Sequence, residues 1–141
     1  MTFDELNTVT QDKIVDMLNN HVASTANILK ENRCLIPMLV IPDSNQIICL
    51  QSSDGSVDVD RAYDISIAKL RNEDFTYALF SYSTRICFDA CGQTDALKTS
   101  IINKNGLEVS FYTPFKIHGL FKKSINIEKS ILFEIKENVF A

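Results

Sequence analysis

FTYALFSYSTRICFDACGQTDALKTSIINKNGLEVSFYTPF, residues 75–115, is the stretch that decides the fold. It holds three runs rich in β-branched and aromatic residues, separated by a loop at Gly92 and by a turn at Lys104-Asn105-Gly106. Residues of these types favour strands, and isolated glycines between such runs mark turns. The stretch therefore predicts three strands that pair as an antiparallel meander, over residues 75–88, 95–103 and 107–115.

The turn at residues 104–106 decides which residues of the second and third strands face each other. A two-residue turn would place Ile102 opposite Val109, whereas a three-residue loop places Ile101 there. A slip of one residue turns a strand's apolar set to solvent. Only the three-residue loop brings one apolar set to a single face: Leu97, Ile101, Leu107, Val109 and Phe111. We therefore predict this loop, with Gly106 in the left-handed region and a bulge there, and the pairs Ile101–Val109, Thr99–Phe111 and Leu97–Thr113.

The whole chain has the length and composition of one domain covering residues 1–141. Its composition, 45% hydrophobic and 23% charged, allows one hydrophobic core without disulfide or metal staples. The net charge of −4 argues against nucleic acid as a partner, because nucleic-acid-binding proteins present a basic surface to phosphates. The four glycines are isolated and form no phosphate-binding loop, so no cofactor is expected.

The sequence also bears on where the protein works. No apolar run reaches the roughly 20 residues that a membrane-spanning helix needs. The N-terminus, Met1-Thr-Phe-Asp-Glu5, lacks the basic start and apolar core of a secretory signal. We therefore expect a cytoplasmic protein without membrane contact. In that compartment the four cysteines are expected to be reduced: Cys34, Cys49, Cys87 and Cys91.

Two helices and three further strands are predicted outside the meander. Apolar residues three and four positions apart predict a first helix from the capping-box spacing at residues 2–5 to about Arg33, with a first turn that could be separate and broken near Asn7. A second helix is predicted over about Val57–Arg71. The strands are predicted at Met38–Ile41, whose continuous apolar run suits burial on both faces, at Gln46–Gln51, and within Ile125–Ile135.

The resulting order is α-β-β-α-β-β-β-β, which predicts an α+β fold. We expect a two-layer domain, a mainly antiparallel sheet of about five to six strands with both helices on one face. This order resembles that of profilin-like and roadblock-like domains. The runs Thr94-Asp95-Ala96, Asn105-Gly106 and Tyr112-Thr113-Pro114-Phe115 resemble small uncharacterised bacterial proteins with Asp-Ala, a hairpin turn and Pro-Tyr or Pro-Phe before a last strand. That resemblance covers the C-terminal half and implies a fold, with no activity attached.

The loop that joins the first two strands of the meander carries residues that could bind a metal ion or act as a nucleophile. Zinc takes four Cys or His ligands, and Cys87-x3-Cys91 could supply two, completed from Cys34, Cys49, His21 or His118. We expect no metal, because Cys34 and Cys49 lie in or beside apolar strands, where a free Cys acts as a small hydrophobe. Cys91 with His118 could form a nucleophile and base. Nothing in the sequence brings them together, so no catalytic residue is assigned.

The candidate binding site of the sequence consists of Arg85, Asp89, Cys91, Asp95 and His118. The two aspartates could act as an acid–base pair, although turn and strand capping is the commoner role in such loops. Arg85 could bind an anion, and a salt bridge to one of the aspartates is favoured. The basic run Lys116–Lys123 could touch RNA or an acidic partner, with a solvated connection favoured.

Three functions are compatible with these patterns. We favour a non-enzymatic binding module that forms a homodimer or binds another protein. The first meander strand is apolar on both faces, and Met38–Ile41 or the last strand could offer an edge for pairing. The second is an immunity or antitoxin-type inhibitor whose acidic surface meets a basic nuclease. The third is a small enzyme that uses the loop Cys87–Asp95 with His118.

Overall fold

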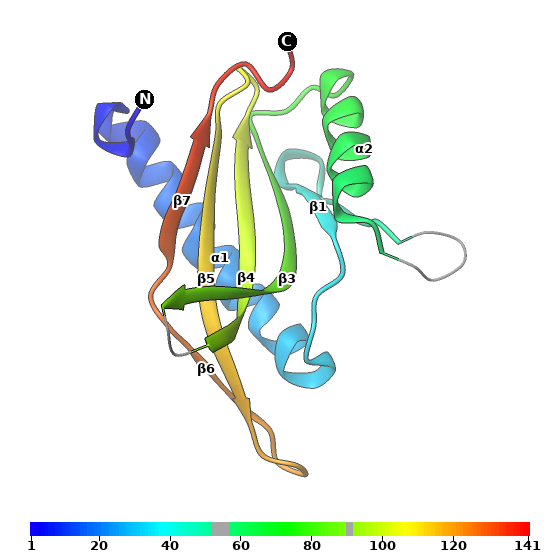
Figure 1. Ribbon diagram of the computed structural model, residues 1–141. Coiled ribbons are helices and arrows are strands. Elements are labelled where there is room, and N and C mark those ends of the chain that lie inside the picture. The colour runs from blue at the N-terminus through cyan, green and yellow to red at the C-terminus, as the bar shows by residue number, and fades with distance from the viewer. Residues whose placement is uncertain (52–56, 90–91) are drawn as a thin grey trace.

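The protein is a curled antiparallel sheet with one long and one short helix (Figure 1), seen in a computed structural model that describes residues 1–51, 57–89 and 92–141. The predicted α+β class and element order are confirmed. The described elements are η1 (Phe3–Glu5), α1 (Thr8–Asn32), β1 (Met38–Ile41), η2 (Pro42–Ser44), β2 (Gln46–Cys49), α2 (Val59–Arg71), β3 (Tyr77–Asp89), β4 (Gly92–Asn103), β5 (Glu108–His118), β6 (Ser124–Ile127) and β7 (Ile131–Lys136). The C-terminal segment thus holds two strands, where one was predicted.

The sheet order is β2-β1-β3-β4-β5-β6, and β7 also pairs with β5. All neighbours are antiparallel. The long strand β5 has two partners on one side, β7 along its first half and β6 along its second. In Figure 1 the β5–β6 ribbon projects from one end of the molecule. The chain therefore ends at a sheet edge formed by β7.

The β4–β5 register is the predicted one. Ile101 pairs with Val109, Thr99 with Phe111 and Leu97 with Thr113. Gly106 has φ +89, in the left-handed region that glycine tolerates best. The Asn103 side chain accepts hydrogen bonds from the backbone N–H groups of Asn105 and Leu107, which stabilises the turn. Leu97, Ile101, Val109 and Phe111 accordingly lie in one buried cluster, with Leu107 packed against it.

Helix α1 covers one face of the sheet. Asn7 caps its N-terminus by accepting from the backbone N–H of Thr10, which ends the separate turn η1 where a break was predicted. Arg33 closes the helix in the left-handed conformation. The buried stripe of α1 is Ile14, Leu18, Val22 and Leu29, and it packs with Leu79, Leu97, Ile101, Val109, Phe111 and Phe115 of the strands.

Helix α2 covers part of the other face. Asp58 caps it by accepting from the backbone N–H of Arg61. Its buried residues Ala62, Ile67 and Leu70 pack in a second cluster. The strand and loop members of that cluster are Leu39, Ile41, Phe75, Ala78, Phe80 and Ile102.

The prediction of two layers with both helices on one face is wrong. Along β3, Leu79 belongs to the α1 cluster, whereas Ala78 and Phe80 belong to the α2 cluster. Successive strand residues point to opposite faces, so the two helices lie on opposite sides and the domain has three layers. The sequence carried this signal at Met38–Ile41, since a strand apolar at every position needs cover on both faces.

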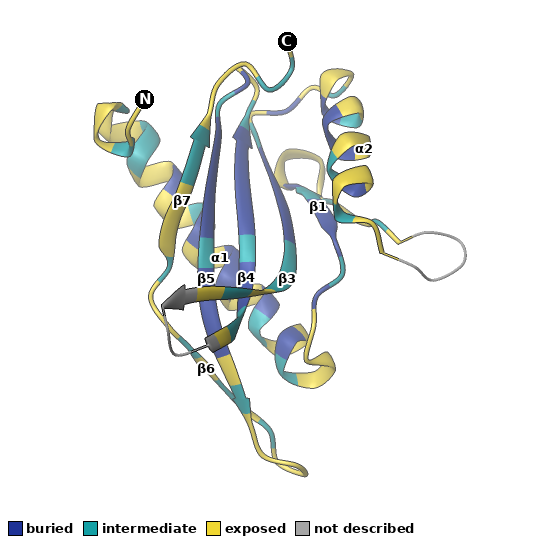
Figure 2. Ribbon diagram, viewed as in Figure 1, coloured by how far each residue is buried: buried dark blue, intermediate teal, exposed yellow. Residues whose placement is uncertain are grey.

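Coverage of the two faces is unequal, because α1 has 25 residues and α2 has 13. In Figure 2 the strand segments beside α2 are buried, whereas β7 and the projecting ribbon are largely exposed. The end of β3 crosses in front of β4 and β5 in this view, on the side of α2. Within the described residues no helix combines the length and the hydropathy of a membrane span.

Candidate functional site

The sequence-predicted site is only partly within the described residues. Arg85 and Asp95 lie directly opposite each other on β3 and β4. Arg85 Nε is 3.1 Å from Asp95 Oδ1, so the salt bridge favoured from the sequence is present, with both side chains largely in solvent. The side chain of Asp89 and all of Cys91 lie outside the described part, and their roles stay predictions. His118 is exposed at the end of β5.

A shallow hollow of about 360 Å³ lies beside this ion pair, at the C-terminal end of α1. Its lining residues are Arg33, Cys34, Ser83, Thr84, Arg85, Asp95, Phe115 and Ile117. Cys34 and Cys49 are both exposed free thiols. From the sequence, both were expected to act as small hydrophobes. In the described ranges no three His, Cys, Asp or Glu residues are placed to hold a metal ion.

His21 and Ser81 form a polar pair inside the core beneath α1. His21 Nε2 is 2.7 Å from Ser81 Oγ, and the backbone oxygen of His21 accepts from the hydroxyl of Thr25. Burial lowers the pKa of His21 from 6.5 to about 4. Because Ser81 is fully buried, no substrate reaches this pair. It is a satisfied polar contact of the core and not a catalytic dyad.

A second polar cluster lies on the α2 face, around the carboxylate of Glu108. This side chain is 2% exposed although it is charged. The hydroxyl of Tyr63 donates to Glu108 Oε1 at 2.6 Å, and Ser110 Oγ and Lys136 Nζ lie 3.4 and 3.9 Å from Oε2. Burial and then the hydrogen bond to Glu108 raise the pKa of Tyr63. Tyr63 therefore keeps its phenolic proton and donates this hydrogen bond throughout the neutral range.

Lys98 lies among three aromatic rings at the middle of the same face. Its Nζ is 5.9 Å from the ring centres of Tyr82 and Tyr112 and 5.2 Å from that of Phe133. Tyr112 and Phe133 pack edge to face across β5 and β7. Burial raises the pKa of Tyr82 to about 12 and also raises the pKa of Tyr112, so both keep their phenolic proton.

A hollow of about 120 Å³ separates the N-terminal half of α2 from these strand residues. It is lined by Val59, Asp60, Tyr63, Phe80, Tyr82, Lys98, Ser100, Glu108 and Lys136. Sequence reasoning missed this site. The available signal was a set of polar residues at alternate positions of two predicted strands, on the face opposite the apolar set. These residues are Lys98 and Ser100, which pair with Tyr112 and Ser110.

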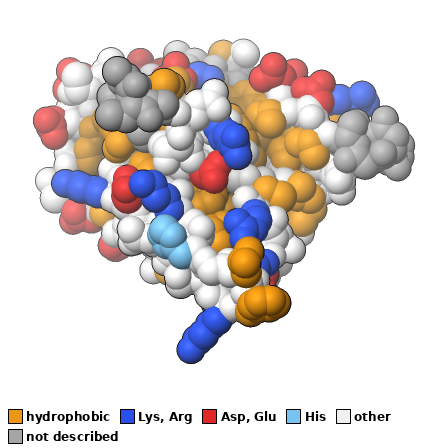
Figure 3. All heavy atoms as spheres, turned by 60° about the horizontal axis from the view of Figure 1, so that its bottom comes forward, with side chains coloured by type: hydrophobic (Ala, Val, Ile, Leu, Met, Phe, Trp, Pro, Cys, Tyr) orange, Lys and Arg blue, Asp and Glu red, His pale blue; other side chains and the backbone are white. Residues whose placement is uncertain are grey.

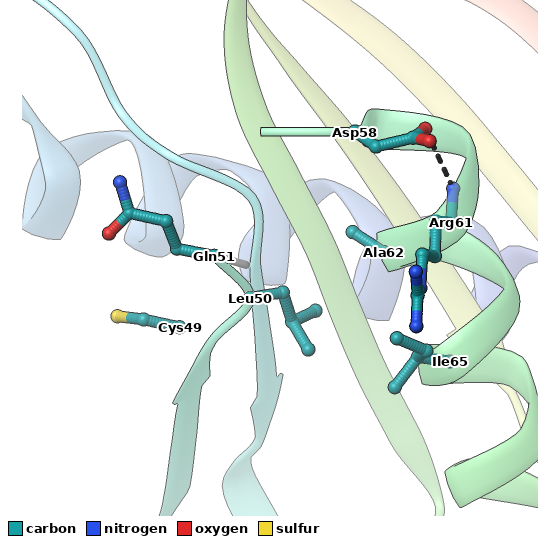
Figure 4. A pocket seen from close by; sticks show the side chains of 7 residues that line it. All are labelled: Cys49, Leu50, Gln51, Asp58, Arg61, Ala62 and Ile65. Atoms are coloured by element: carbon teal, nitrogen blue, oxygen red, sulfur yellow. Dashed lines mark hydrogen bonds between the residues drawn. The ribbon is translucent and has the colours of Figure 1, made fainter. Parts of the chain in front are cut away.

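Another pocket, of about 310 Å³, lies between the end of β2 and α2 (Figure 4). Leu50, Ala62 and Ile65 give it an apolar floor, and Asp58 binds the backbone of Arg61 across its rim. Cys49 and Gln51 point away from the helix in this view.

The edge of the sheet at β7 exposes large apolar side chains. Ile131, Leu132 and Phe133 are consecutive, and they are 45%, 43% and 52% exposed. The tip of the β5–β6 ribbon exposes two more, Leu120 and Phe121. Figure 3 turns this end of the molecule forward and shows hydrophobic and basic side chains together on it.

No family model matches the chain, and neither a curated protein nor a solved structure matches it. The resemblances in element order and in the C-terminal half therefore stay expectations. What the fold and the sites define is an α+β domain with a helix on each side of its sheet, an exposed apolar edge and a polar–aromatic hollow.

Proposed function

We propose that the protein is a non-enzymatic binding module whose docking edge is β7, and that the strand added there belongs to a second copy of the chain. The carrying observation is the run Ile131–Phe133, three large apolar side chains in succession on an edge strand. Natural edge strands are normally short, charged or covered, because open backbone groups invite pairing. An edge that is apolar and open is suited to strand addition.

The two edges of the sheet differ in this respect. β2 has four residues and is flanked by the turn η2, whereas β7 has six and is paired on one side only among the described strands. Ile131 and Phe133 lie on the α2 side, next to Tyr112, and Leu132 lies on the α1 side, opposite Phe111. A strand added along β7 would therefore cover apolar groups on both faces.

The apolar run of β7 is complementary to itself, although the register of β7 against β5 shifts at Phe133 and Glu128 lies before the strand. A twofold axis perpendicular to the sheet at Leu132 would pair this residue with its own copy and place Ile131 opposite Phe133 of the second copy. The same register would bring Lys136 alongside Glu128 of the second copy. Such apolar and opposite-charge cross-strand pairs stabilise by roughly 0.2–1 kcal/mol each. A closed twofold dimer also leaves no further edge of this kind to recruit more copies.

The apolar faces of β3 do not support binding to a partner. The two-sided apolar character of β3 suggested a face that a partner would cover. Helix α2 covers Ala78 and Phe80 within the chain itself. The proposal therefore rests on the edge at β7 and no longer on the faces of β3.

Light scattering on the purified protein tests the proposal. At micromolar concentration we expect twice the monomer mass of 15.9 kDa. Leu132→Lys would place two lysines next to each other across the twofold axis, and we expect a monomer because like charges directly opposite repel. Ile47→Lys on β2 is the matched control, since Ile47 is an exposed apolar residue at the opposite edge, and it should leave the dimer intact.

Three outcomes would contradict this. A monomeric wild-type protein would remove the second copy as the partner. A dimer that survives Leu132→Lys would place the interface elsewhere. A complex with a different protein that depends on Leu132 would keep β7 as the docking edge and replace the second copy as its occupant.

A further inference from the structure

The ammonium group of Lys98 is a half-buried cation with no carboxylate within 4.0 Å in the part of the chain that the structure describes. Two acids of the same face, Glu108 and Glu134, have other partners. Glu108 is held by Tyr63 and Lys136, and Glu134 lies 3.7 Å from Lys136 Nζ. A partly desolvated charge is costly unless it is paired.

The three rings around Lys98 offset part of that cost without neutralising the charge. A cation over an aromatic face gains roughly 0.5–2 kcal/mol, depending on its desolvation. The rings also restrict where the ammonium can move, because Tyr82, Tyr112 and Phe133 surround it at 5.2–5.9 Å. Lys98 is thus held in place by groups that leave its positive charge open to an anion.

The hollow beside Lys98 has the size and the donors that such an anion needs. Its volume of about 120 Å³ corresponds to roughly four water molecules at ~30 Å³ each, which suits a phosphate or a carboxylate group. Lys98 and Lys136 contribute ammonium groups and Tyr82 contributes a hydroxyl, whereas the hydroxyl of Ser100 is already hydrogen-bonded to Ser110. Asp60 is the opposing charge on the wall, and Glu108 is already bound by Tyr63.

We propose that this hollow, the Lys98 site, binds an oxyanion, phosphate or carboxylate, carried on a flat apolar group that packs against the ring of Tyr112. Lys98 supplies the charge, and Tyr82 is the hydroxyl donor. Tyr112 is half-buried beside Lys98 and outside the lining of the hollow, so the apolar group would extend from the hollow towards its ring. The site shares Phe133 and Lys136 with β7, but no residue of a second copy is needed to form it, so loss of the dimer would not count against it.

Phenyl phosphate, benzoate and inorganic phosphate are the probes, titrated at constant ionic strength. The chain has four tyrosines and no tryptophan, so tyrosine fluorescence reports on the rings near Lys98, and amide NMR shifts locate the binding. We expect saturable binding, with phenyl phosphate tighter than inorganic phosphate. Preference between phenyl phosphate and benzoate then decides whether the natural group is a phosphate or a carboxylate.

Lys98→Met keeps the length of the side chain and removes its charge, and we expect affinity to fall about tenfold or more, ~1.4 kcal/mol. Lys104→Met, at the exposed β4–β5 turn, is the matched control and should change affinity by less than about twofold, under ~0.4 kcal/mol. Tyr112→Leu should lower the preference for phenyl phosphate over inorganic phosphate. Lys98→Arg should still bind, which keeps the test open if Lys98→Met does not fold.

The proposal is overturned if no probe saturates below about 10 mM, where binding free energy is under ~3 kcal/mol. It is also overturned if Lys98→Met binds like the wild type, or if Lys104→Met loses as much affinity as Lys98→Met. Binding that leaves the amide shifts of β4 unchanged would place the ligand elsewhere and overturn it as well.

Discussion

The two faces of the sheet are built from the same strands and differ in almost every other respect. The α1 face holds aliphatic and aromatic side chains beneath a 25-residue helix, and its polar pair His21–Ser81 is buried there. Hollows of about 360 and 410 Å³ lie along the margins of this helix. The α2 face is closed only beside a 13-residue helix, and beyond it lie Lys98, Tyr112 and the hollow over Glu108. The two faces therefore differ in what lines their hollows, because apolar surface predominates beside Leu18 and Val22 of α1, whereas charged and aromatic side chains line the hollow beside Lys98.

Strand β4 shows how one sequence serves both purposes. Leu97, Thr99 and Ile101 point to α1 and are buried, whereas Lys98 and Ser100 alternate with them and point to the α2 side. The period of two along a strand separates these sets without any other device. Substitutions on each side can test how strictly the two faces are separated.

Leu97→Ala should produce the largest loss of stability. Leu97 is among the most buried side chains of the α1 face, and closed packing leaves little room for relaxation around the cavity. We expect unfolding free energy to fall by about 2–5 kcal/mol, measured by urea denaturation. Leu120→Ala at the exposed ribbon tip is the control and should stay within about 0.5 kcal/mol. Equal losses in both variants would show that the α1 face is not the dominant core.

Acid should destabilise the α1 face through His21. Its pKa is about 4 in the folded protein and near 6.5 when exposed. Both states are neutral above about pH 6.5, so the full stability is present there. As pH falls towards 4 the unfolded chain takes up the proton first, and roughly 3 kcal/mol is lost at ~1.4 kcal/mol per pKa unit.

The measurement compares wild type with His21→Asn, by urea denaturation at pH 7 and at about pH 4.5. Carboxylates titrate alike in both proteins, so the difference between their pH profiles isolates His21. We expect the wild type to lose roughly 2–3 kcal/mol more than the variant over this range. Parallel profiles would mean that His21 is protonated in the folded protein and that the α1 face is wetter than its burial indicates.

Gly106→Val should disturb the register that assigns each residue to its face. Gly106 has φ +89, and an added Cβ would lie 3.3 Å from Asn138 Cα and from Val139 N, both backbone atoms. A β-branched residue in this region costs roughly 1–3 kcal/mol. Thermal unfolding should show the loss, and Asn105→Val, at a position with ordinary φ, should lose clearly less. A loss of only a few tenths of a kcal/mol would mean that the turn does not fix the register.

Local patterns in the sequence predicted most of the scaffold correctly. The three-residue turn and its cross-strand pairs follow from Gly106 and from the spacing of apolar residues around it. The break before α1 follows from the capping preference of Asn7. These features depend on residues close together in the chain, where periodicity and turn chemistry are informative.

Features that depend on distant segments were predicted poorly. The side on which α2 packs is set by Phe80 and Ile102 from separate strands, and the helix's own pattern does not choose a face. The Glu108 cluster joins α2, β5 and β7 through Tyr63 and Lys136, residues 45 and 28 positions away. The Arg85–Asp95 pair was predictable because a single hairpin places these residues opposite each other.

Tyr63→Phe should give the smallest effect and sharpen the contrast between the faces. It removes the 2.6 Å hydrogen bond to Glu108 Oε1 while keeping the ring. A buried charged acceptor left unpaired costs about 1–3 kcal/mol, and here Lys136 and the adjacent hollow let solvent and a second cation compensate. We therefore expect the lower end, about 1 kcal/mol in urea denaturation.

Ser81→Ala is the matched change on the α1 face, because it removes the partner of His21 Nε2 where both side chains are buried. It should cost more than Tyr63→Phe, by about 1 kcal/mol. The reverse order would mean that the α2 side is the more tightly closed of the two. The hollow beside Lys98 would then admit less solvent than the proposed oxyanion site requires.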